Sequence, residues 1–114
     1  MPEIFEYLNL IFSFYSNEHE PIHVHVKIAE RETIFDLIIK EKTLVEIRQR
    51  NRQGKAPLTA KETKTAIEFI EQYSSKIVEK WVNFFVLGAR VRKTVIKPEK
   101  KKIEISLHLK NKKE

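Results

Sequence analysis

The sequence predicts an α+β protein in which a four-stranded antiparallel meander is followed by two helices and a C-terminal basic β-hairpin. Three observations favour this fold: apolar residues alternate with a period of two in the first half of the chain, follow helical spacing after a central polar loop, and alternate again in a basic tail. With 114 residues, the chain has the length of one domain. We therefore expect one compact unit, with an α+β region over residues 1–88 and a basic hairpin extension over residues 89–114.

Four segments in the first half predict the strands of the meander. Apolar residues occupy the even positions over residues 8–15 and again over 22–28, with turn-forming residues between the two segments. Residues 33–39 and 43–49 are rich in β-branched side chains and are separated by a short polar segment, as in a hairpin. Sequential strands with short connections favour antiparallel neighbours.

A polar loop at residues 51–57 separates these strands from a helical region. Thr59 and Glu62 form a capping-box pattern, which predicts that a helix begins directly after Thr59. Apolar residues then recur at helical spacing as far as Gly88, a residue suited to a helix C-terminal cap. A serine pair at residues 74–75 interrupts this pattern, so the region forms two helices or one kinked helix.

The basic tail predicts the hairpin. Residues 89–97 and 103–109 alternate between apolar and polar side chains, and Pro98 begins a turn between them. Residues 90–113 carry ten basic and two acidic side chains, a net charge of +8, although the whole chain carries only +6. Any attraction of a polyanion is therefore expected to begin in this tail.

The composition excludes several classes of function. Only two glycines are present, which excludes a Gly-rich phosphate loop and a dinucleotide-binding fingerprint. The absence of cysteine excludes disulfides, a thiolate nucleophile and cysteine-ligated metal sites, and it fits a reducing, cytoplasmic location. The longest apolar stretch, at residues 81–89, is less than half the length of a membrane-spanning helix, so we expect no membrane partner.

A group of histidines is the main candidate site. His19, His23 and His25 fall within seven residues. In a strand, His23, His25 and Lys27 project from one face, with neighbouring Cα atoms of the row about 6.6 Å apart. His19 precedes a proline, in a loop that could fold back over this row. The imidazoles are therefore expected to converge.

This group fits two chemical roles and one structural role. As a metal site, His23 and His25 would hold a divalent ion such as zinc together with His19, or with Glu18 or Glu20 in its place, and leave one coordination position open. As a metal-free site for RNA cleavage, His23 and His25 would act as general base and general acid, while Lys27 offsets charge on the phosphorane. In the structural alternative, the same side chains pack on a half-exposed sheet and hydrogen-bond to neighbours. Geometry rather than spacing decides among these roles.

Two groups of basic residues are candidates for nucleic-acid binding. Three arginines at alternate positions of the segment 48–52 are expected to align on one strand face, which suits the tracking of phosphates. A solvated row of charges that protects a sheet edge has the same pattern. The second group lies at the start of the basic tail, which has no interleaved aromatic residues for base stacking. The residues predicted to contact nucleic acid are Arg48, Arg50, Arg52, Arg90, Arg92 and Lys93.

The segment around the histidines resembles a known family, the uncharacterised bacterial proteins called domain of unknown function four-one-six-zero, whose signature is D-H-x-P-P-H-F-H. The matching positions are Glu18, in the acidic place, His19, Pro21, His23 and His25. Ile22 and Val24 depart from the second proline and the phenylalanine of the signature. The resemblance continues through the strands and the helical region, including Trp81, and covers about three-quarters of the chain.

The resemblance implies a connection to small two-gene toxin–antitoxin cassettes, because genes of this family are similar to them in size and setting. Our leading hypothesis is a component of such a pair that engages RNA or DNA, with the histidines as its site and the tail as its electrostatic anchor. One alternative is a metal-binding protein that uses the same histidines. Another is a non-catalytic interaction module, in which the 103–109 strand joins the sheet of a small protein partner or forms a homodimer.

Overall fold

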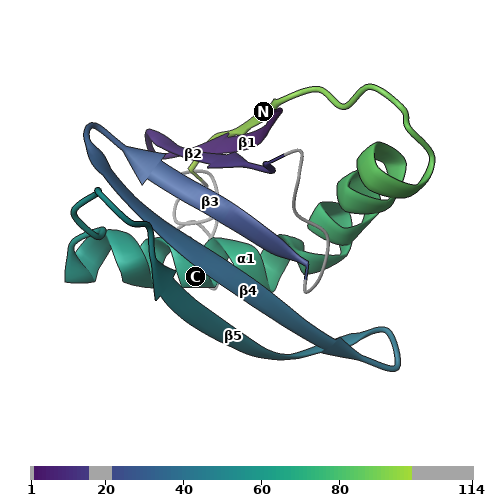
Figure 1. Ribbon diagram of the computed structural model, residues 1–114, viewed down its shortest axis with the longest axis horizontal. Coiled ribbons are helices and arrows are strands. Elements are labelled where there is room, and N and C mark those ends of the chain that lie inside the picture. The colour runs from purple at the N-terminus through teal and green to yellow at the C-terminus, as the bar shows by residue number, and fades with distance from the viewer. Residues whose placement is uncertain (1, 16–21, 99–114) are drawn as a thin grey trace, which may run out of the picture.

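The computed structural model describes residues 2–15 and 22–98, which form one six-stranded sheet with a long helix packed on it (Figure 1). The elements are β1 (Glu3–Tyr7), β2 (Leu10–Ser13), β3 (His23–Ile28), β4 (Arg31–Lys40), β5 (Thr43–Asn51), α1 (Ala60–Trp81), a π-helical continuation η1 (Val82–Val86) and β6 (Thr94–Ile96). The strand order is β5-β4-β3-β2-β1-β6, and all neighbours are antiparallel except β1 and β6, so the sheet is mixed.

The predicted four-stranded meander is wrong, because the sheet contains two further strands, β1 and β6. The predicted strand at 8–15 begins inside a turn: Leu8 and Asn9 connect β1 to β2 and have φ angles of 49° and 68°. Two consecutive positive φ values are typical of a type I′ hairpin turn, which Asn-Gly signals far more clearly than Leu-Asn does. Leu8 is 49% exposed, so its apolar side chain extended the alternation where no strand exists.

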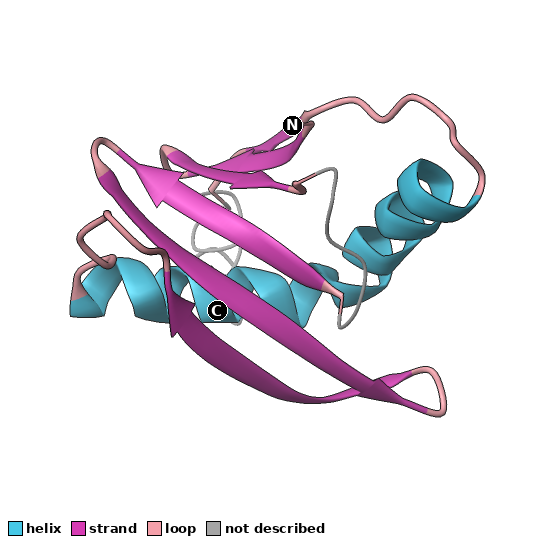
Figure 2. Cartoon of the chain, viewed as in Figure 1, coloured by secondary structure: helices cyan, strands magenta, loops and turns pink. Residues whose placement is uncertain are grey.

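Of the two alternatives for the helical region, two separate helices is wrong and one kinked helix is confirmed, since one helical run extends from α1 through η1. A bend occurs at Tyr73, whose φ of −108° and ψ of 20° are not helical, directly before the serine pair (Figure 2). Helical structure resumes after the bend and brings Ile77 and Trp81 into the core. Gly88, with a φ of 67°, ends the run, and the N–H of Ala89 donates to the carbonyl of Asn83 at 2.7 Å.

Of the predicted basic hairpin, the described residues contain one short strand, β6. β6 pairs in parallel with β1, so that Phe5 lies opposite Thr94 and Tyr7 opposite Ile96. The 103–109 segment, its predicted partner, lies outside the described residues. Period two identifies a strand but not its neighbour, and here the free edge of β1 supplies the backbone hydrogen bonds that β6 requires.

The start of α1 confirms the predicted capping box. Thr59 Oγ1 accepts a hydrogen bond from the N–H of Glu62 at 3.2 Å, and Glu62 Oε1 accepts one from the N–H of Thr59 at 2.9 Å. Downstream, Phe69 packs on Phe12 with ring centroids 4.6 Å apart, and Trp81 packs edge-on against Phe14 at 5.4 Å. The core therefore lies between the sheet and this helix.

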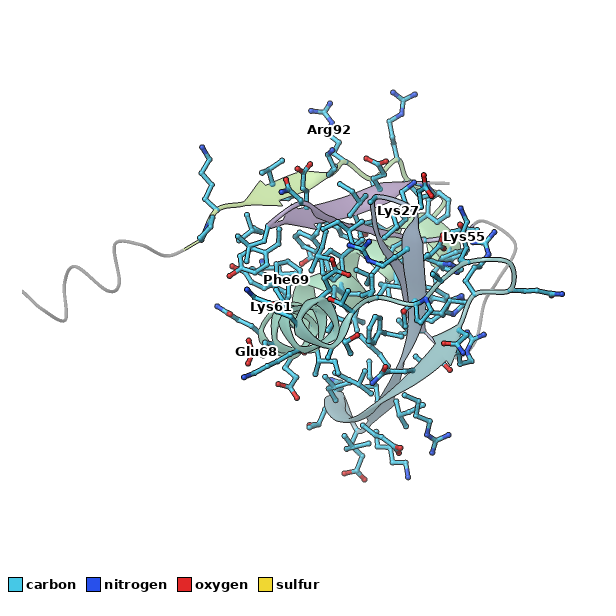
Figure 3. The ribbon with its side chains drawn as sticks, turned by 90° about the vertical axis from the view of Figure 1, so that its left-hand side faces the viewer. Lys27, Lys55, Lys61, Glu68, Phe69 and Arg92 are labelled. Carbon is cyan, nitrogen blue, oxygen red and sulfur yellow. The ribbon has the colours of Figure 1, made fainter. Side chains whose placement is uncertain are left out.

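The opposite side of the sheet has a different character. In the side view, Lys61 and Glu68 of α1 lie on one side of the molecule and Lys55 on the other, with strands between them (Figure 3). Polar and charged side chains gather on the face that the first half of α1 does not cover, and this face carries the candidate site. None of the helices in the described residues is long and apolar enough to cross a membrane.

Candidate functional site

The register of β3 and β4 places His23, His25 and Lys27 on one face of the sheet. The valines between them are fully buried in the core on the other face. The residues directly opposite them on β4 are, in the same order, Asp36, Ile34 and Glu32. Two carboxylates therefore share the face of the histidine row.

His25 is held on this face by two close partners. Its Nδ1 lies 2.8 Å from Oε2 of Glu32, and its ring stacks on Tyr15 with centroids 3.6 Å apart and an interplanar angle of 17°. Only 3% of His25 and 4% of Glu32 are exposed. An ionised carboxylate only accepts hydrogen bonds, so Nδ1 carries the hydrogen of this bond.

Glu32 is the centre of a group of four residues, Tyr15, His25, Glu32 and Arg52, which we call the Glu32 cluster. The Tyr15 hydroxyl donates to Oε2 of Glu32 at 3.1 Å, and Arg52 Nη1 donates to the same oxygen at 2.9 Å. Arg52 also donates to the Tyr15 hydroxyl, and its guanidinium carbon lies 4.6 Å from the centroid of the Tyr15 ring. These contacts connect β2, β3, β4 and the end of β5.

The electrostatics of the cluster keep Glu32 charged. Burial raises the pKa of Glu32, but hydrogen bonds from His25 and Tyr15 and the charge of Arg52 outweigh burial and hold this pKa below its ordinary value. Burial raises the pKa of the Tyr15 hydroxyl, so this group remains a donor at neutral pH. The cluster is thus a buried carboxylate surrounded by donors.

The three arginines of β5 and its end lie on the same face, and each is paired with a carboxylate. Arg50 donates twice to Asp36, at 2.8 Å for both bonds, and Asp36 is only 8% exposed. Arg48 donates to both carboxylate oxygens of the exposed Glu46, at 2.9 and 3.1 Å. Arg52 belongs to the Glu32 cluster. Arg50 and Arg52 are therefore oriented by buried carboxylates, and Arg48 by an exposed one.

His23 has different surroundings from His25. Its ring centroid lies 5.7 Å from that of His25 and 5.7 Å from that of Trp81, and the side chain is almost fully buried. Among the described residues, no group of three His, Cys, Asp or Glu could hold a metal ion, and His19, the third predicted ligand, lies outside them. The catalytic roles of His23, His25 and Lys27, and the zinc-type site, therefore stay predictions.

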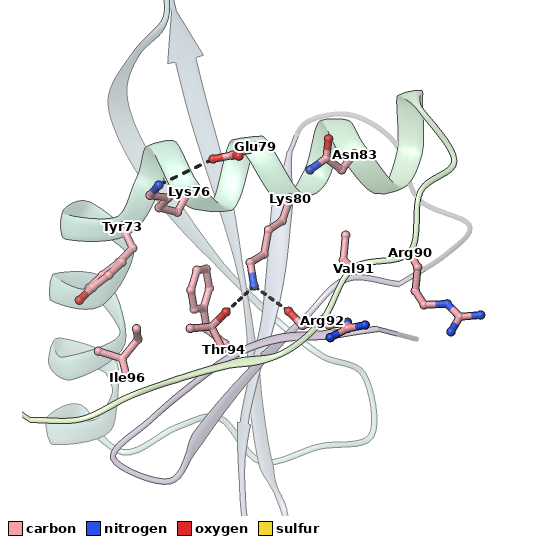
Figure 4. A pocket seen from close by; sticks show the side chains of 11 residues that line it. Tyr73, Lys76, Glu79, Lys80, Asn83, Arg90, Val91, Arg92, Thr94 and Ile96 are labelled. Atoms are coloured by element: carbon pink, nitrogen blue, oxygen red, sulfur yellow. Dashed lines mark hydrogen bonds and ion pairs between the residues drawn. The ribbon is translucent and has the colours of Figure 1, made fainter.

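The basic residues of the tail lie elsewhere on the molecule. Lys93 pairs with Glu6 at 3.0 Å and with Glu3 at 3.3 Å. Arg90 and Arg92 are exposed and line a cavity between α1 and the segment that leads into β6 (Figure 4). The six predicted nucleic-acid contacts are thus divided between two sites instead of forming one patch.

Lys80 of α1 fastens the tail segment to the sheet. Its Nζ donates to the backbone oxygens of Ile4 at 2.8 Å and Arg92 at 2.7 Å, and to Oγ1 of Thr94 at 3.0 Å. The same ammonium lies 4.3 Å from the centroid of the Phe5 ring. Burial lowers the pKa of Lys80 from its ordinary value. One side chain therefore connects the helix to both strands of the parallel pair.

Sequence reasoning missed the acidic partners that organise this face. Asp36 interrupts the apolar segment 33–39, and Glu32 comes directly before it. A carboxylate within an otherwise apolar strand signals a paired buried charge, because an unpaired one is too costly to bury. The part played by Tyr15 had no such signal, since it depends on how the chain returns to place β2 beside β3.

The fold and the site define a small α+β protein with a mixed sheet, one long helix on one face, and a buried glutamate cluster beside an arginine row on the other. A family model described as domain of unknown function (DUF4160) matches residues 9–82, more than half of the chain, and the chain belongs to this family. The matched segment contains the Glu32 cluster and the arginine row but neither β1 nor β6. Searches of curated proteins and of solved structures found no match to this chain.

Proposed function

We propose that this protein binds RNA or DNA through its arginine row, as one member of a toxin–antitoxin-like pair in the cytoplasm. The observation that supports binding is the alignment of Arg48, Arg50 and Arg52 on one face, each held by a carboxylate. The partner protein is inferred from the family resemblance, and the location from the absence of cysteine.

The carboxylates orient the arginines without using all of their donors. A guanidinium carries five N–H groups, and a bidentate pair occupies two of them. Arg48 places Nε and Nη2 on Glu46 while its side chain remains 61% exposed. Asp36 and Glu32, which are buried in the sheet, give Arg50 and Arg52 rigid supports. A phosphate that binds here meets side chains that have already lost much of their conformational entropy.

Attraction and positioning are separate tasks in this proposal. Each arginine of the row is balanced by one carboxylate, so the row itself has little long-range field. The tail, with its excess of basic residues, supplies that field and raises the rate of encounter. Directed phosphate contacts from the row then fix the orientation of the bound strand.

A binding assay at several salt concentrations tests the proposal. We expect short labelled RNA or DNA to bind the full chain with an affinity that decreases as salt rises. Arg48→Ala should lower the affinity and reduce the slope of log affinity against log salt by about one, as for the loss of one phosphate contact. Lys64→Ala, which removes a charge from the exposed side of α1, is the matched control. Absence of binding at low salt, or equal slopes for both variants, would contradict the proposal.

The same assay tests the predicted cleavage and metal binding. Labelled RNA is incubated with the protein, with and without added zinc, and the products are separated on a gel. Cleavage that disappears in His25→Asn but persists in Lys64→Ala would support the catalytic prediction for the histidines. Binding without cleavage under both conditions would leave the protein as a non-catalytic nucleic-acid-binding module.

A further inference from the structure

A cavity of about 470 Å³ lies where the second half of α1 passes over the segment that leads into β6 (Figure 4). Ligand sites in proteins commonly have volumes of this order. The bend at Tyr73 precedes the part of the helix that roofs the cavity, and Lys76, Lys80 and Asn83 line that roof. The cavity lies on the helix-covered side of the sheet, because Phe5 lines it and also packs on Phe69.

The two ends of the cavity differ in chemistry. Figure 4 places Tyr73 and Ile96 at one end and Arg90 at the other, with Arg92 between Thr94 and Arg90. The Tyr73 ring stacks on Phe69, with centroids 4.4 Å apart and an interplanar angle of 16°, which fixes its plane. One end therefore has an aromatic and an apolar side chain, with Lys76 beside them and near Glu79, and the other end has a guanidinium group (Figure 4).

The charges around the cavity are not balanced. Four basic residues and one acidic residue line it, which leaves a net charge of +3, and the acidic residue, Glu79, lies 3.9 Å from Lys76. The Lys80 ammonium already donates to three oxygens, so it contributes charge but no further hydrogen bonds. Arg90 and Arg92 are exposed, and no carboxylate of the described residues pairs with them. An anion in this cavity therefore binds mainly to these two guanidinium groups.

We propose that this cavity binds a nucleotide unit, with the base at the Tyr73 and Ile96 end and the phosphate between Arg90 and Arg92. Two guanidinium groups can together match the oxygens of a doubly charged phosphate, and a ring held in a fixed plane is a stacking surface for any base. A singly charged aliphatic carboxylate fits less well, because it leaves one arginine unpaired. A free nucleotide and the phosphorylated end of a strand present the same chemical group, so both satisfy this site.

Calorimetric titration of the full chain tests the proposal with adenosine monophosphate, adenosine and inorganic phosphate as separate probes. We expect the monophosphate to bind, and each of its two fragments to bind at least about tenfold more weakly. The double variant Arg90→Ala/Arg92→Ala should weaken binding of the monophosphate by about tenfold or more, because two charged hydrogen-bond donors are lost. Lys97→Ala, which removes a charge from the same segment beside a different cavity, should leave the affinity unchanged.

Further titrations separate this proposal from nucleic-acid binding by the arginine row. Arg48 lies on the other face of the sheet, so the Arg48→Ala variant should bind the monophosphate with unchanged affinity. A 5′-phosphorylated dinucleotide that binds more tightly than the monophosphate would identify a strand end as the ligand, and equal affinities would identify a free nucleotide. The proposal is overturned by the absence of monophosphate binding, by an unchanged affinity in the double variant, or by tighter binding of octanoate.

Discussion

Arginines occupy two very different environments in this molecule. On the face of the sheet that the first half of α1 does not cover, Arg48, Arg50 and Arg52 are each held by a carboxylate, and two of those carboxylates are almost fully buried. At the cavity beside α1, Arg90 and Arg92 extend from a segment that is fastened through Lys80, and no described carboxylate holds them. The first group is ordered before any ligand arrives, whereas the second keeps its conformational freedom and its charge.

This contrast indicates how the two sites use charge. A paired row costs little entropy on binding but attracts weakly over distance, because its charges are balanced. Two arginines without carboxylate partners attract an anion strongly, but the ligand must order their side chains when it binds. The family match covers the first site but ends before Arg90 and Arg92, so the ordered row belongs to the family segment and the cavity also depends on residues outside it.

The largest expected effect comes from breaking the support of the ordered row. Glu32→Ala removes a buried carboxylate that accepts from three side chains, and we expect a loss of about 3 kcal/mol in the free energy of unfolding. Urea denaturation measures this loss, with Glu46→Ala, an exposed carboxylate, as the control. A loss as small as that of the control would show that the cluster does not hold the sheet together.

A smaller loss in the free energy of unfolding is expected when the hydrogen bonds of Lys80 beside the cavity are removed. Lys80→Met keeps the length of the side chain but removes hydrogen bonds to three oxygens, which should cost about 2 kcal/mol and release β6 from β1. Hydrogen exchange at the amides of residues 94–96 measures this release, and Lys76→Met serves as the control because Lys76 has only a distant contact with Glu79. Unchanged protection of β6 would mean that its pairing with β1 needs no lysine.

Acid should weaken the fold through two carboxylates, Glu32 on the face of the arginine row and Glu62 at the start of α1. The folded-state pKa of Glu32 lies below its ordinary value of 4.5, and that of Glu62, bonded to Arg31 and to the backbone of Thr59, is lowered to about 2. A lowered folded-state pKa gives stability that is fully present above pH 4.5 and is lost as the pH falls through the folded-state value. We expect the free energy of unfolding to fall between these limits, and Glu32→Gln and Glu62→Gln each to flatten the fall. If both variants lost stability in acid just as the unaltered protein does, protonation of Glu32 and Glu62 would not be the cause of that loss.

The smallest effect is expected at the outer end of the row. Arg48 and Glu46 form an exposed ion pair, and a double-mutant cycle of Arg48→Ala with Glu46→Ala should give a coupling energy of about 0.5 kcal/mol. Denaturation of the four proteins measures it at low and high salt, and the coupling should decrease as salt rises. A coupling energy of several kcal/mol would contradict the expectation that an exposed carboxylate holds its arginine more weakly than a buried carboxylate does.

Much of the fold follows from local patterns. Alternation identified β3, and richness in β-branched residues identified β4 and β5. The row of His23, His25 and Lys27 shares one face, as the alternation predicts. Thr59 and Glu62 located the start of α1. The Leu8–Asn9 turn escaped detection because Leu8 is apolar and continues the alternation, and no glycine accompanies Asn9. The helical spacing could not decide between two helices and one kinked helix, because the bend at Tyr73 depends on packing.

The candidate site was only partly visible in the sequence. The grouped histidines pointed to β3 as the site. They did not indicate that Nδ1 of His25 is hydrogen-bonded to Glu32, or that the Tyr15 ring stacks on the His25 ring. These partners come from other strands, so their proximity depends on register and not on spacing along the chain. The basic tail likewise looked like one uniform segment, although Lys93 pairs with glutamates of β1 and its neighbours line a cavity.

Taken alone, the sequence determined that the segments of β3, β4 and β5 are extended, that a helix begins after Thr59, and which side chains of these elements alternate toward the core, because these properties depend on neighbours a few residues away. Only the tertiary structure decided that β6 joins β1 in parallel, that buried carboxylates hold the arginines of β5, and that Lys80 closes one wall of a cavity. Each of these contacts joins residues that are distant in the chain, and their free energy exists only after the sheet and the helix have packed together.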